Sequence, residues 1–322
     1  MSAATNLRGP ARVEINEVAP RDGLQIEPAV VPTDAKVAFL DALSACGFAR
    51  IEATSFTSAR AIPALADAEA LMHRMRRHPG VRYTALVPNL RGLERALSCQ
   101  PDEVNLVMSA SETHNRANLR MTRQQSQEQL LAMIEAARGA GVPVNISLST
   151  VFGCPFEGEV DGAAVMALAT RFAEAGAAGI TLCDTTGMAY PNQVAALCEA
   201  FQAALPATGL TIHLHNTRGM GLANALAAWQ TGVTRFDAAA GGLGGCPYAP
   251  GASGNVSTED LVHMFDCMGV ETGVDLGALL DVVAGMPALV GRDIHSQLLS
   301  AGPRLRTHQP PAWMAEHFAG QA

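Results

Sequence analysis

Residues 179–216, GITLCDTTGMAYPNQVAALCEAFQAALPATGLTIHLHN, contain two apolar runs separated by a longer segment of helical period. The runs Gly179–Cys183 and Leu210–Asn216 are short and rich in apolar and β-branched residues, which predicts two buried strands. Between them, Asn192–Leu205 is rich in Ala and Leu, which favour helices. Two strands joined by a helix pair in parallel through a right-handed crossover. The segment therefore predicts one β/α unit of a parallel sheet.

The same alternation extends in both directions from this unit. Six more segments read as strands: Val13–Val18, Arg50–Thr54, Val81–Val87, Glu103–Met108, Val142–Thr150 and Arg235–Ala239. Further segments have helical period, namely Asp34–Cys46, Ile62–Arg77, Ser126–Ala140, Ala163–Ala175 and Gly221–Thr231. Several of the helices should end at a glycine in the left-handed region, at Gly47, Gly141, Gly176 and Gly232. Eight such units close most economically as a (β/α)8 TIM barrel of the α/β class, with a doubly wound open sheet as the alternative.

A C-terminal helical extension is expected after the eighth strand. A glycine-rich loop, Gly241–Asn255, is followed by helical patterns at Thr258–Met268 and Leu276–Ala284. We therefore expect an N-terminal tail at residues 1–12 and a barrel domain at 13–300, with appended helices from about residue 257. Residues 301–322 form a tail whose order the sequence does not predict, because two prolines follow one another there.

Composition excludes several classes of function. The chain has 322 residues and a formal net charge of -8, which argues against a nucleic-acid-binding surface. Its seven cysteines are scattered without a C-x-x-C pair, so neither a disulfide framework nor a thiolate zinc site is predicted. No stretch of about 18 apolar residues and no secretory leader is present, so we expect no membrane partner and a cytoplasmic location.

Polar residues at the predicted C-terminal strand ends are the candidates for chemistry, because TIM-barrel sites lie there. Arg21 and Asp22 follow the first strand, although they could form a simple surface ion pair. Glu52 and Asp184 stand at other strand ends. His213 and His215 share one face of their strand, as metal ligands would, although a hydrogen-bonded pair without a metal is the alternative.

The glycine-rich loop carries two further candidates, Cys246 and Asn255. Dense glycine permits close backbone approach to a ligand and hinge motion. The alternative is a plain flexible loop with an ordinary buried thiol. The loop does not match a dinucleotide-binding fingerprint, because it follows the eighth unit rather than opening the first.

Together these motifs resemble a known family. The matching segments are Pro20–Gln25, Ile51–Phe56, Gly153–Gly158, Asp184-Thr185, His213-x-His215 and Gly242–Asn255. They resemble 3-hydroxy-3-methylglutaryl-CoA lyase, of the DRE-TIM metallolyase superfamily, over roughly Val13 to Leu276. The Arg-Asp and His-x-His pieces are shared with related condensing synthases, whereas the Cys246 loop is typical of the lyases.

The resemblance implies a set of roles. It places Mg²⁺ or Mn²⁺ on Asp22, His213, His215 and Asn255, with substrate oxygens completing the shell. Catalytic roles are expected for Arg21, Asp22, Glu52, Asp184, His213 and Cys246. Arg21 would face the thioester carbonyl, Glu52 and Asp184 would orient groups and manage protons, and Cys246 would close over the site. The substrate-binding residues would be Arg21, Gln25 and Ser55.

The implied reaction is a retro-Claisen cleavage of a 3-hydroxy-3-methyl acyl-CoA, with 3-hydroxy-3-methylglutaryl-CoA giving acetyl-CoA and acetoacetate. CoA is part of the substrate, and a homo-oligomer, dimer or tetramer, is expected. Alternatives are a lyase for citramalyl-CoA or a longer 3-hydroxyglutaryl-CoA, a condensing synthase of the isopropylmalate or homocitrate type, and a silent CoA-ester-binding barrel. The synthases carry His-x-His-Asn-Asp, whereas here Thr217 follows Asn216. Ile26 and Cys183 depart from the lyase pattern, which leaves the acyl group open.

Overall fold

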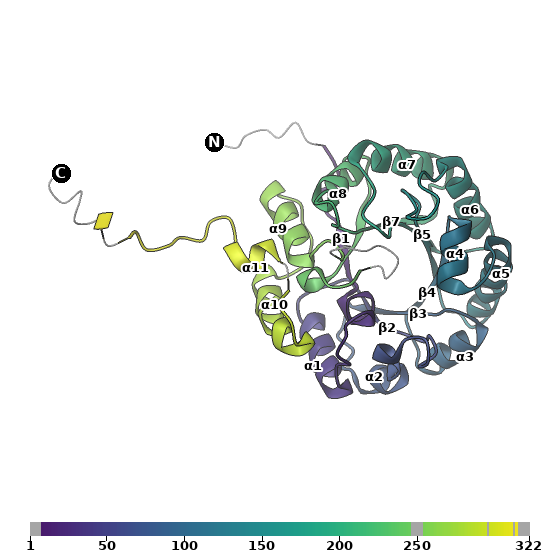
Figure 1. Cartoon of the computed structure of the whole chain (residues 1–322), viewed down its shortest axis with the longest axis horizontal. Helices are drawn as coiled ribbons and strands as arrows, with labels where there is room; N and C mark the ends of the chain where they lie inside the picture. The colour runs from purple at the N-terminus through teal and green to yellow at the C-terminus, as the bar shows by residue number, and fades with distance from the viewer. Residues whose placement is uncertain (1–7, 246–253, 295, 312, 315–322) are drawn as a thin grey trace.

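Eight parallel strands form a closed barrel in which each strand pairs with its neighbours in chain order and β8 pairs with β1 (Figure 1). The computed structural model describes residues 8–245, 254–294, 296–311 and 313–314. The strands are β1 (Glu14–Glu17), β2 (Arg50–Ser55), β3 (Arg82–Leu86), β4 (Glu103–Ser109), β5 (Val144–Ser149), β6 (Gly179–Asp184), β7 (Gly209–Leu214) and β8 (Arg235–Ala238). The TIM barrel is thus confirmed, and the open sheet is excluded because β1 and β8 are hydrogen-bonded partners.

Helices surround the barrel and cover its outer face (Figure 1). They are α1 (Thr33–Ser44), α2 (Ala68–Arg74), α3 (Leu90–Ser98), α4 (Glu112–Leu119), α5 (Arg123–Gly139), α6 (Gly162–Glu174), α7 (Pro191–Ala204) and α8 (Gly221–Gln230). The four glycines expected at helix ends all have positive φ, between 76° and 101°. These glycines end the helices and turn the chain into the next strand, as the sequence predicts.

The segment predicted as one helix, Ile62–Arg77, is shorter in the structure. It begins as a 3₁₀ turn, η2 (Pro63–Leu65), and only Ala68–Arg74 is α-helical. The backbone N–H of Arg76 donates to Asp41 Oδ1 at 2.7 Å, a contact made outside the helical hydrogen-bond pattern. This contact holds the chain in the non-helical path that it takes from Met75 onward.

In the part of the chain that the structure describes, three helices follow the barrel: α9 (Thr258–Met268), α10 (Leu276–Val290) and α11 (Gln297–Ala301). They lie beside α1 and β1, on one side of the barrel (Figure 1). Helix α10 runs past the predicted end at Ala284, because Met286 and Val290 continue its buried face. Arg292 forms a two-pronged ion pair with Glu27 at 2.5 and 2.9 Å, which ties the extension to the loop after β1.

The interior of the barrel is polar. A cavity of about 20 Å³ is lined mainly by polar side chains from several strands, which we call the polar interior: Asn16, Arg50, Glu52, Thr84, Glu103, Asn105, Asn145, Thr181, Thr211 and Asp237. Their hydrogen bonds join neighbouring strands; for example, Asn145 donates to Asn105 Oδ1 at 3.0 Å. Apolar side chains instead fill the layer between strands and helices. The polar interior lies directly beneath the strand ends that carry the candidate site.

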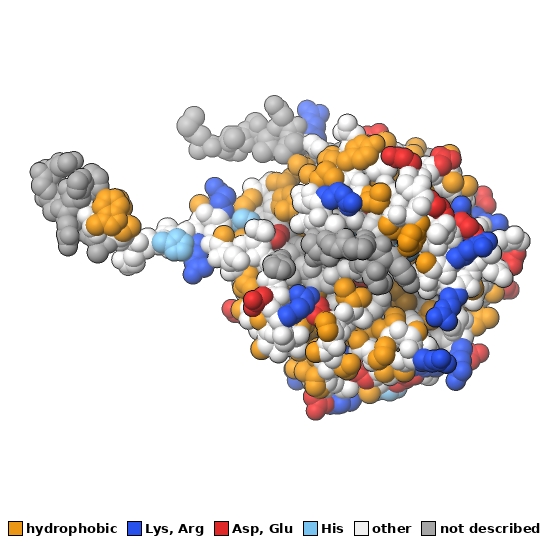
Figure 2. Space-filling view, viewed as in Figure 1, with side chains coloured by type: hydrophobic (Ala, Val, Ile, Leu, Met, Phe, Trp, Pro, Cys, Tyr) orange, Lys and Arg blue, Asp and Glu red, His pale blue; other side chains and the backbone are white. Residues whose placement is uncertain are grey.

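Two findings concern partners. Among the described residues, no helix combines the length and the apolar character needed to cross a bilayer. The face drawn in Figure 2 mixes basic, acidic and apolar side chains, with no continuous basic tract on it.

Candidate active site

Arg21 and Asp22 are brought to the top of the barrel by the turn that follows β1. The chain leaves β1 at Glu17 and enters a π-helical turn, η1 (Ala19–Gly23). Arg21 Nη1 donates to Asp22 Oδ1 at 2.6 Å, and Arg21 Nε donates to Glu52 Oε2 at 2.5 Å. Arg21 is buried with 9% of its surface exposed. The pair is therefore part of a buried cluster, and the simple surface ion pair is excluded.

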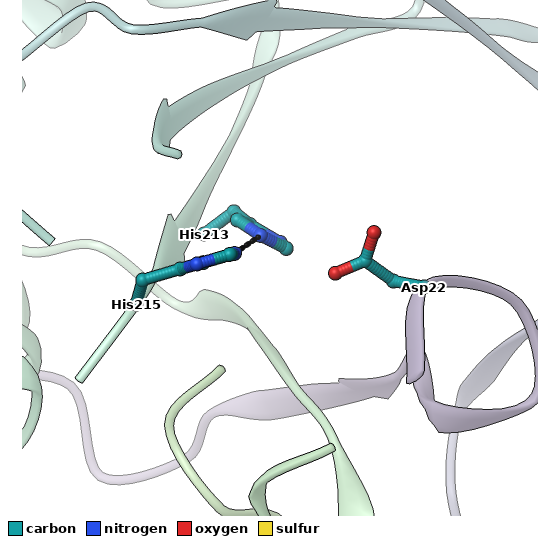
Figure 3. Close-up of side chains that lie close together, drawn as sticks. All are labelled: Asp22, His213 and His215. Atoms are coloured by element: carbon teal, nitrogen blue, oxygen red, sulfur yellow. Dashed lines mark hydrogen bonds between the residues drawn. The ribbon is translucent and has the colours of Figure 1, made fainter. Parts of the chain in front are cut away.

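His213 and His215 come from the end of β7 and face each other. Their Nε2 atoms lie 3.2 Å apart, and both residues are buried. Figure 3 shows the two imidazoles on one side of a gap and the Asp22 carboxyl group on the other. One ligand atom from each of these three residues lies within 4.8 Å of the other two. The period-two argument thus placed the two rings on one face, as the structure shows.

Asn255 completes this group from the chain that follows β8. Its backbone forms a bridge with His215, and its Nδ2 donates to Asp22 Oδ2 at 2.7 Å and to the Leu243 carbonyl at 2.9 Å. Its Oδ1 is buried and meets no hydrogen-bond partner in the described part of the chain. A buried carbonyl oxygen without a hydrogen bond lowers the stability of the fold unless it binds a ligand.

The four residues fit a hard or borderline divalent cation. They offer two imidazole nitrogens, a carboxylate and the unpartnered amide oxygen of Asn255, which is a donor set typical of such metals. Burial opposes the charge on Asp22, but the Arg21 and histidine charges outweigh it and hold the pKa of Asp22 at about 2. Burial and the neighbouring His213 lower the pKa of His215 to about 3. At neutral pH, Asp22 is ionised and His215 is neutral, which is the state that a metal ligand requires.

Glu52 lies beneath Arg21 and links it to the polar interior. Its Oε2 accepts from Arg21, and its Oε1 accepts from Asn105 Nδ2 at 2.8 Å. Burial raises the pKa of Glu52 above its ordinary value, although Arg21 and Asn105 act in the opposite direction. The arrangement fixes the orientation of the guanidinium group, and Glu52 is therefore placed to position Arg21.

Asp184 ends β6, in register with Leu214 between the two histidines of the neighbouring strand. Its Oδ1 accepts from the Met188 backbone at 2.7 Å, whereas its buried Oδ2 has no partner among the residues described. Burial raises the pKa of Asp184 to about 6. A carboxyl group that titrates near neutrality beside the metal candidates is suited to accept or return a proton.

The other predicted site residues are less closely involved. Gln25 follows η1 and is half-buried. Ser55 ends β2 and is buried, and its Oγ lies 2.7 Å from Thr57 Oγ1 in the loop that follows. Cys246 lies outside the described residues. The substrate-binding roles of Gln25 and Ser55 and the catalytic role of Cys246 stay predictions.

Asp237 and Asn105 belong to the site's surroundings, and the sequence reasoning missed both. Asp237 Oδ2 lies 3.2 Å from His213 Nδ1, and Asn105 holds Glu52. Each is a polar residue within a predicted strand, where an apolar side chain is usual. That signal was available, but it does not reveal which site residue the polar group contacts.

The chain is similar to known proteins in both sequence and structure. A family model described as HMGL-like matches residues 12–285. A solved structure of an HMG-CoA lyase from Acinetobacter baumannii, in complex with coenzyme A and 3-methylmalate, superposes with a TM-score of 0.90 at 48% identity, covering 94% of this chain and 98% of that one.

Two curated relatives carry different names. A hydroxymethylglutaryl-CoA lyase of Bacillus subtilis is 44% identical over 90% of this chain and 97% of its own length. An (R)-citramalyl-CoA lyase of Chloroflexus aurantiacus is 43% identical over 90% of this chain and 95% of its own. The family model covers most of the chain, and these relatives are similar over nearly their whole length. The chain therefore belongs to the HMGL-like family of carbon–carbon lyases.

Proposed function

We propose that this chain is a divalent-metal-dependent lyase that cleaves 3-hydroxy-3-methylglutaryl-CoA to acetyl-CoA and acetoacetate. The observation that carries the proposal is the convergence of Asp22, His213 and His215 within 4.8 Å, beside Arg21. The chain that holds this cluster is 44% identical to a hydroxymethylglutaryl-CoA lyase. A barrel that only binds CoA esters, without catalysis, would not need a buried group of metal-ligating side chains.

Each site residue has a separate role in the proposed retro-Claisen cleavage. When bound, Mg²⁺ or Mn²⁺ supplies Lewis-acid polarisation of the substrate's oxygens. Arg21 keeps its charge at every working pH and is fixed by Glu52, so it can stabilise the negative charge that develops on the thioester oxygen. Asp184, with a pKa of about 6 and a free buried oxygen, can take the proton of the tertiary hydroxyl group. Cys246 is proposed to return a proton to the enolate.

A second candidate substrate is citramalyl-CoA. The relative named for it is as similar to this chain as the hydroxymethylglutaryl-CoA lyases are, at 43% against 44% identity. Both thioesters carry a tertiary alcohol with a methyl group, so the same residues serve either cleavage. Selectivity between the two acyl groups would depend on the residues around the site, such as the buried Cys183, which is in register with His213.

The test is a panel of 3-hydroxyacyl-CoA thioesters incubated with metal-free enzyme and added Mg²⁺ or Mn²⁺, with products read by mass spectrometry. We expect acetyl-CoA and acetoacetate from 3-hydroxy-3-methylglutaryl-CoA, and loss of activity when a chelator removes the cation. Pyruvate with acetyl-CoA from citramalyl-CoA at a higher rate would favour the second candidate. Activity that survives complete chelation would contradict the metal-dependent mechanism.

The remaining proposals concern the setting of the enzyme. We propose a homo-oligomer, dimer or tetramer, since large apolar side chains such as Leu305 are 76% exposed after α11. We propose a cytoplasmic location, since the described cysteines are all free thiols, as is usual in a reducing compartment. Light scattering of the purified chain and fractionation of the source cell test these two proposals.

A further inference from the structure

Asp237 on β8 faces His213 across the parallel pair β7–β8. The two residues are register partners, and Asp237 Oδ2 lies 3.2 Å from His213 Nδ1. Both side chains are largely buried, with 9% of the His213 side chain and 12% of the Asp237 side chain exposed. A contact of this kind in the barrel wall is shielded from water, which makes it stronger than the same contact on the surface.

The contact bears on which nitrogen of His213 carries hydrogen. The opposite ring nitrogen, Nε2, points to His215 Nε2 at 3.2 Å and so belongs to the metal-ligand cluster. A neutral imidazole has a single N–H, and a hydrogen on Nε2 would remove the lone pair that a cation needs. An acidic acceptor beside Nδ1 favours the tautomer with hydrogen on Nδ1 and leaves Nε2 free.

His215 lacks such a contact. Its Nδ1 is buried and has no hydrogen-bond partner within the described ranges. Its position is set instead by the backbone bridge to Asn255. Of the two histidines, His213 is therefore the one whose tautomer is influenced by a neighbouring side chain.

Asp237 is itself held from below by the polar interior. Asn16 Nδ2 donates to Asp237 Oδ1 at 2.8 Å, and Asn16 is 95% buried. Both residues line the cavity of about 20 Å³, which has room for about one water molecule. Asn16 Oδ1 is buried and unpartnered among the residues described. Because Asn16 holds Asp237 Oδ1, the other carboxylate oxygen of Asp237, Oδ2, stays directed at His213.

We propose that Asp237 is a positioning residue that fixes the His213 ring with hydrogen on Nδ1 and so prepares Nε2 to bind the catalytic cation. The inference rests on the proposed metal site and deepens it, because it assigns a determinant of metal affinity to a residue outside the proposed ligand set. Asn16 supports Asp237 in this role.

The test compares Asp237→Asn with the wild type by titrating metal-free protein with Mn²⁺ and following free Mn²⁺ by electron paramagnetic resonance. An amide of the same shape can donate to Nδ1 and stabilise the wrong tautomer. We expect Mn²⁺ affinity to fall about 10- to 100-fold, the usual effect of losing such a partner. In ¹⁵N-histidine spectra of the metal-free protein, the His213 signals should change from the Nδ1–H to the Nε2–H pattern.

Glu103→Gln is the matched control, because Glu103 is another buried acid of the polar interior but pairs with Arg50 rather than with His213. It should keep wild-type Mn²⁺ affinity. Should Asp237→Asn not fold, Asn16→Ala decides, with an expected loss of several-fold, and unchanged affinity in that variant would overturn the inference. Wild-type affinity and an unchanged His213 pattern in Asp237→Asn would also overturn it. A wild type that binds no Mn²⁺ would instead defeat the proposed metal site.

Discussion

Arg21 contacts two acids at once, Asp22 and Glu52, and this determines what its removal should do. Arg21→Met keeps all four proposed metal ligands but removes the positive charge that we propose stabilises the developing enolate. We expect kcat to fall by about 10²-fold or more with a smaller change in KM, as for loss of one preorganised donor. Steady-state kinetics with the preferred thioester measure this. A near-normal kcat would show that Arg21 serves only to pair Asp22 and Glu52.

At this scale the sequence allows a side chain to be placed on a strand face or at a strand end, but it does not give the contacts of that side chain. His213 and His215 could be placed on one face because strand side chains alternate with period two. Asp22 is a candidate from its place at a strand end, but its role as a metal ligand together with Asn255 could be expected only from the family resemblance, since the two residues lie 233 positions apart. Asp237 could not be assigned at all, because its partnership with His213 depends on the register of β7 against β8. The register depends on how the whole barrel closes, so it cannot be deduced from the sequence of either strand alone.

The turn beside Asn255 is an element whose backbone the site requires. Gly244 has φ of 99°, and a Cβ there would lie 2.5 Å from Asn255 Nδ2 and 3.2 Å from Asp22 Oδ2. Gly244→Ala should therefore push Asn255 away from Asp22 and weaken Mn²⁺ binding by about tenfold or more, by analogy with loss of other groups that orient metal ligands. Isothermal titration of metal-free protein with Mn²⁺ measures this loss.

Gly219→Ala is the control for that prediction. Gly219 also has positive φ, 70°, but no atom of the described residues, its own chain neighbours aside, lies within 4 Å of the Cβ that a substitution would add. It carries the backbone strain without the collision. If both variants lose affinity equally, the effect comes from general strain rather than from displacement of Asn255.

Among the elements, the strands were predictable because each is a short buried run, and all eight predicted strands match observed ones to within two residues at either end. The helices α3 and α4 were not among the predicted segments. Both are short, and each begins at a side-chain cap, Asn89 or Ser111. Helix α4 is largely polar, whereas α3 carries Leu90, Leu93 and Leu97 at helical spacing over only about two and a half turns. Local capping of this kind stabilises a helix without producing the long apolar stripe that sequence periodicity detects.

At the scale of the whole molecule, Glu17 joins parts of the chain that are distant in sequence. Its Oε1 accepts from the backbone N–H groups of Ala19 and Ala240, and its Oε2 lies 2.8 Å from Thr258 Oγ1. Burial raises the pKa of Glu17 to about 8, and the hydrogen bonds only partly oppose this. The folded protein therefore keeps a proton on Glu17 that the unfolded chain releases above pH of about 4.5.

This difference predicts a pH dependence of stability. Between pH of about 4.5 and 8 the folded state binds more protons than the unfolded state, so the free energy of unfolding falls as pH rises and levels off above about 8. Glu17→Gln cannot ionise and should lose this fall, so its stability relative to wild type should improve steadily from pH 5 to 8. Urea unfolding of metal-free protein at several pH values measures it.

Glu135→Gln serves as the control, because Glu135 is an exposed acid on α5. It should follow the wild-type curve at every pH. If Glu17→Gln also follows that curve, Glu17 is ionised in the folded state, and its burial must be offset by contacts stronger than those described.

The distance along the chain between Asp22 and Asn255 also has a consequence for how the protein is made. A ribosome adding roughly 5–20 residues per second needs about 10–50 s to cover the 233 positions between them. During that time one edge of β1 stays unpaired, because its partner in the closed barrel, β8, has not yet been synthesised for most of it. A chain released between His215 and Asn255 would therefore contain Arg21, Asp22 and both histidines, yet lack the amide that joins Asp22 to the Leu243 turn. Prematurely ended products should consequently be inactive and prone to aggregate, rather than partly active.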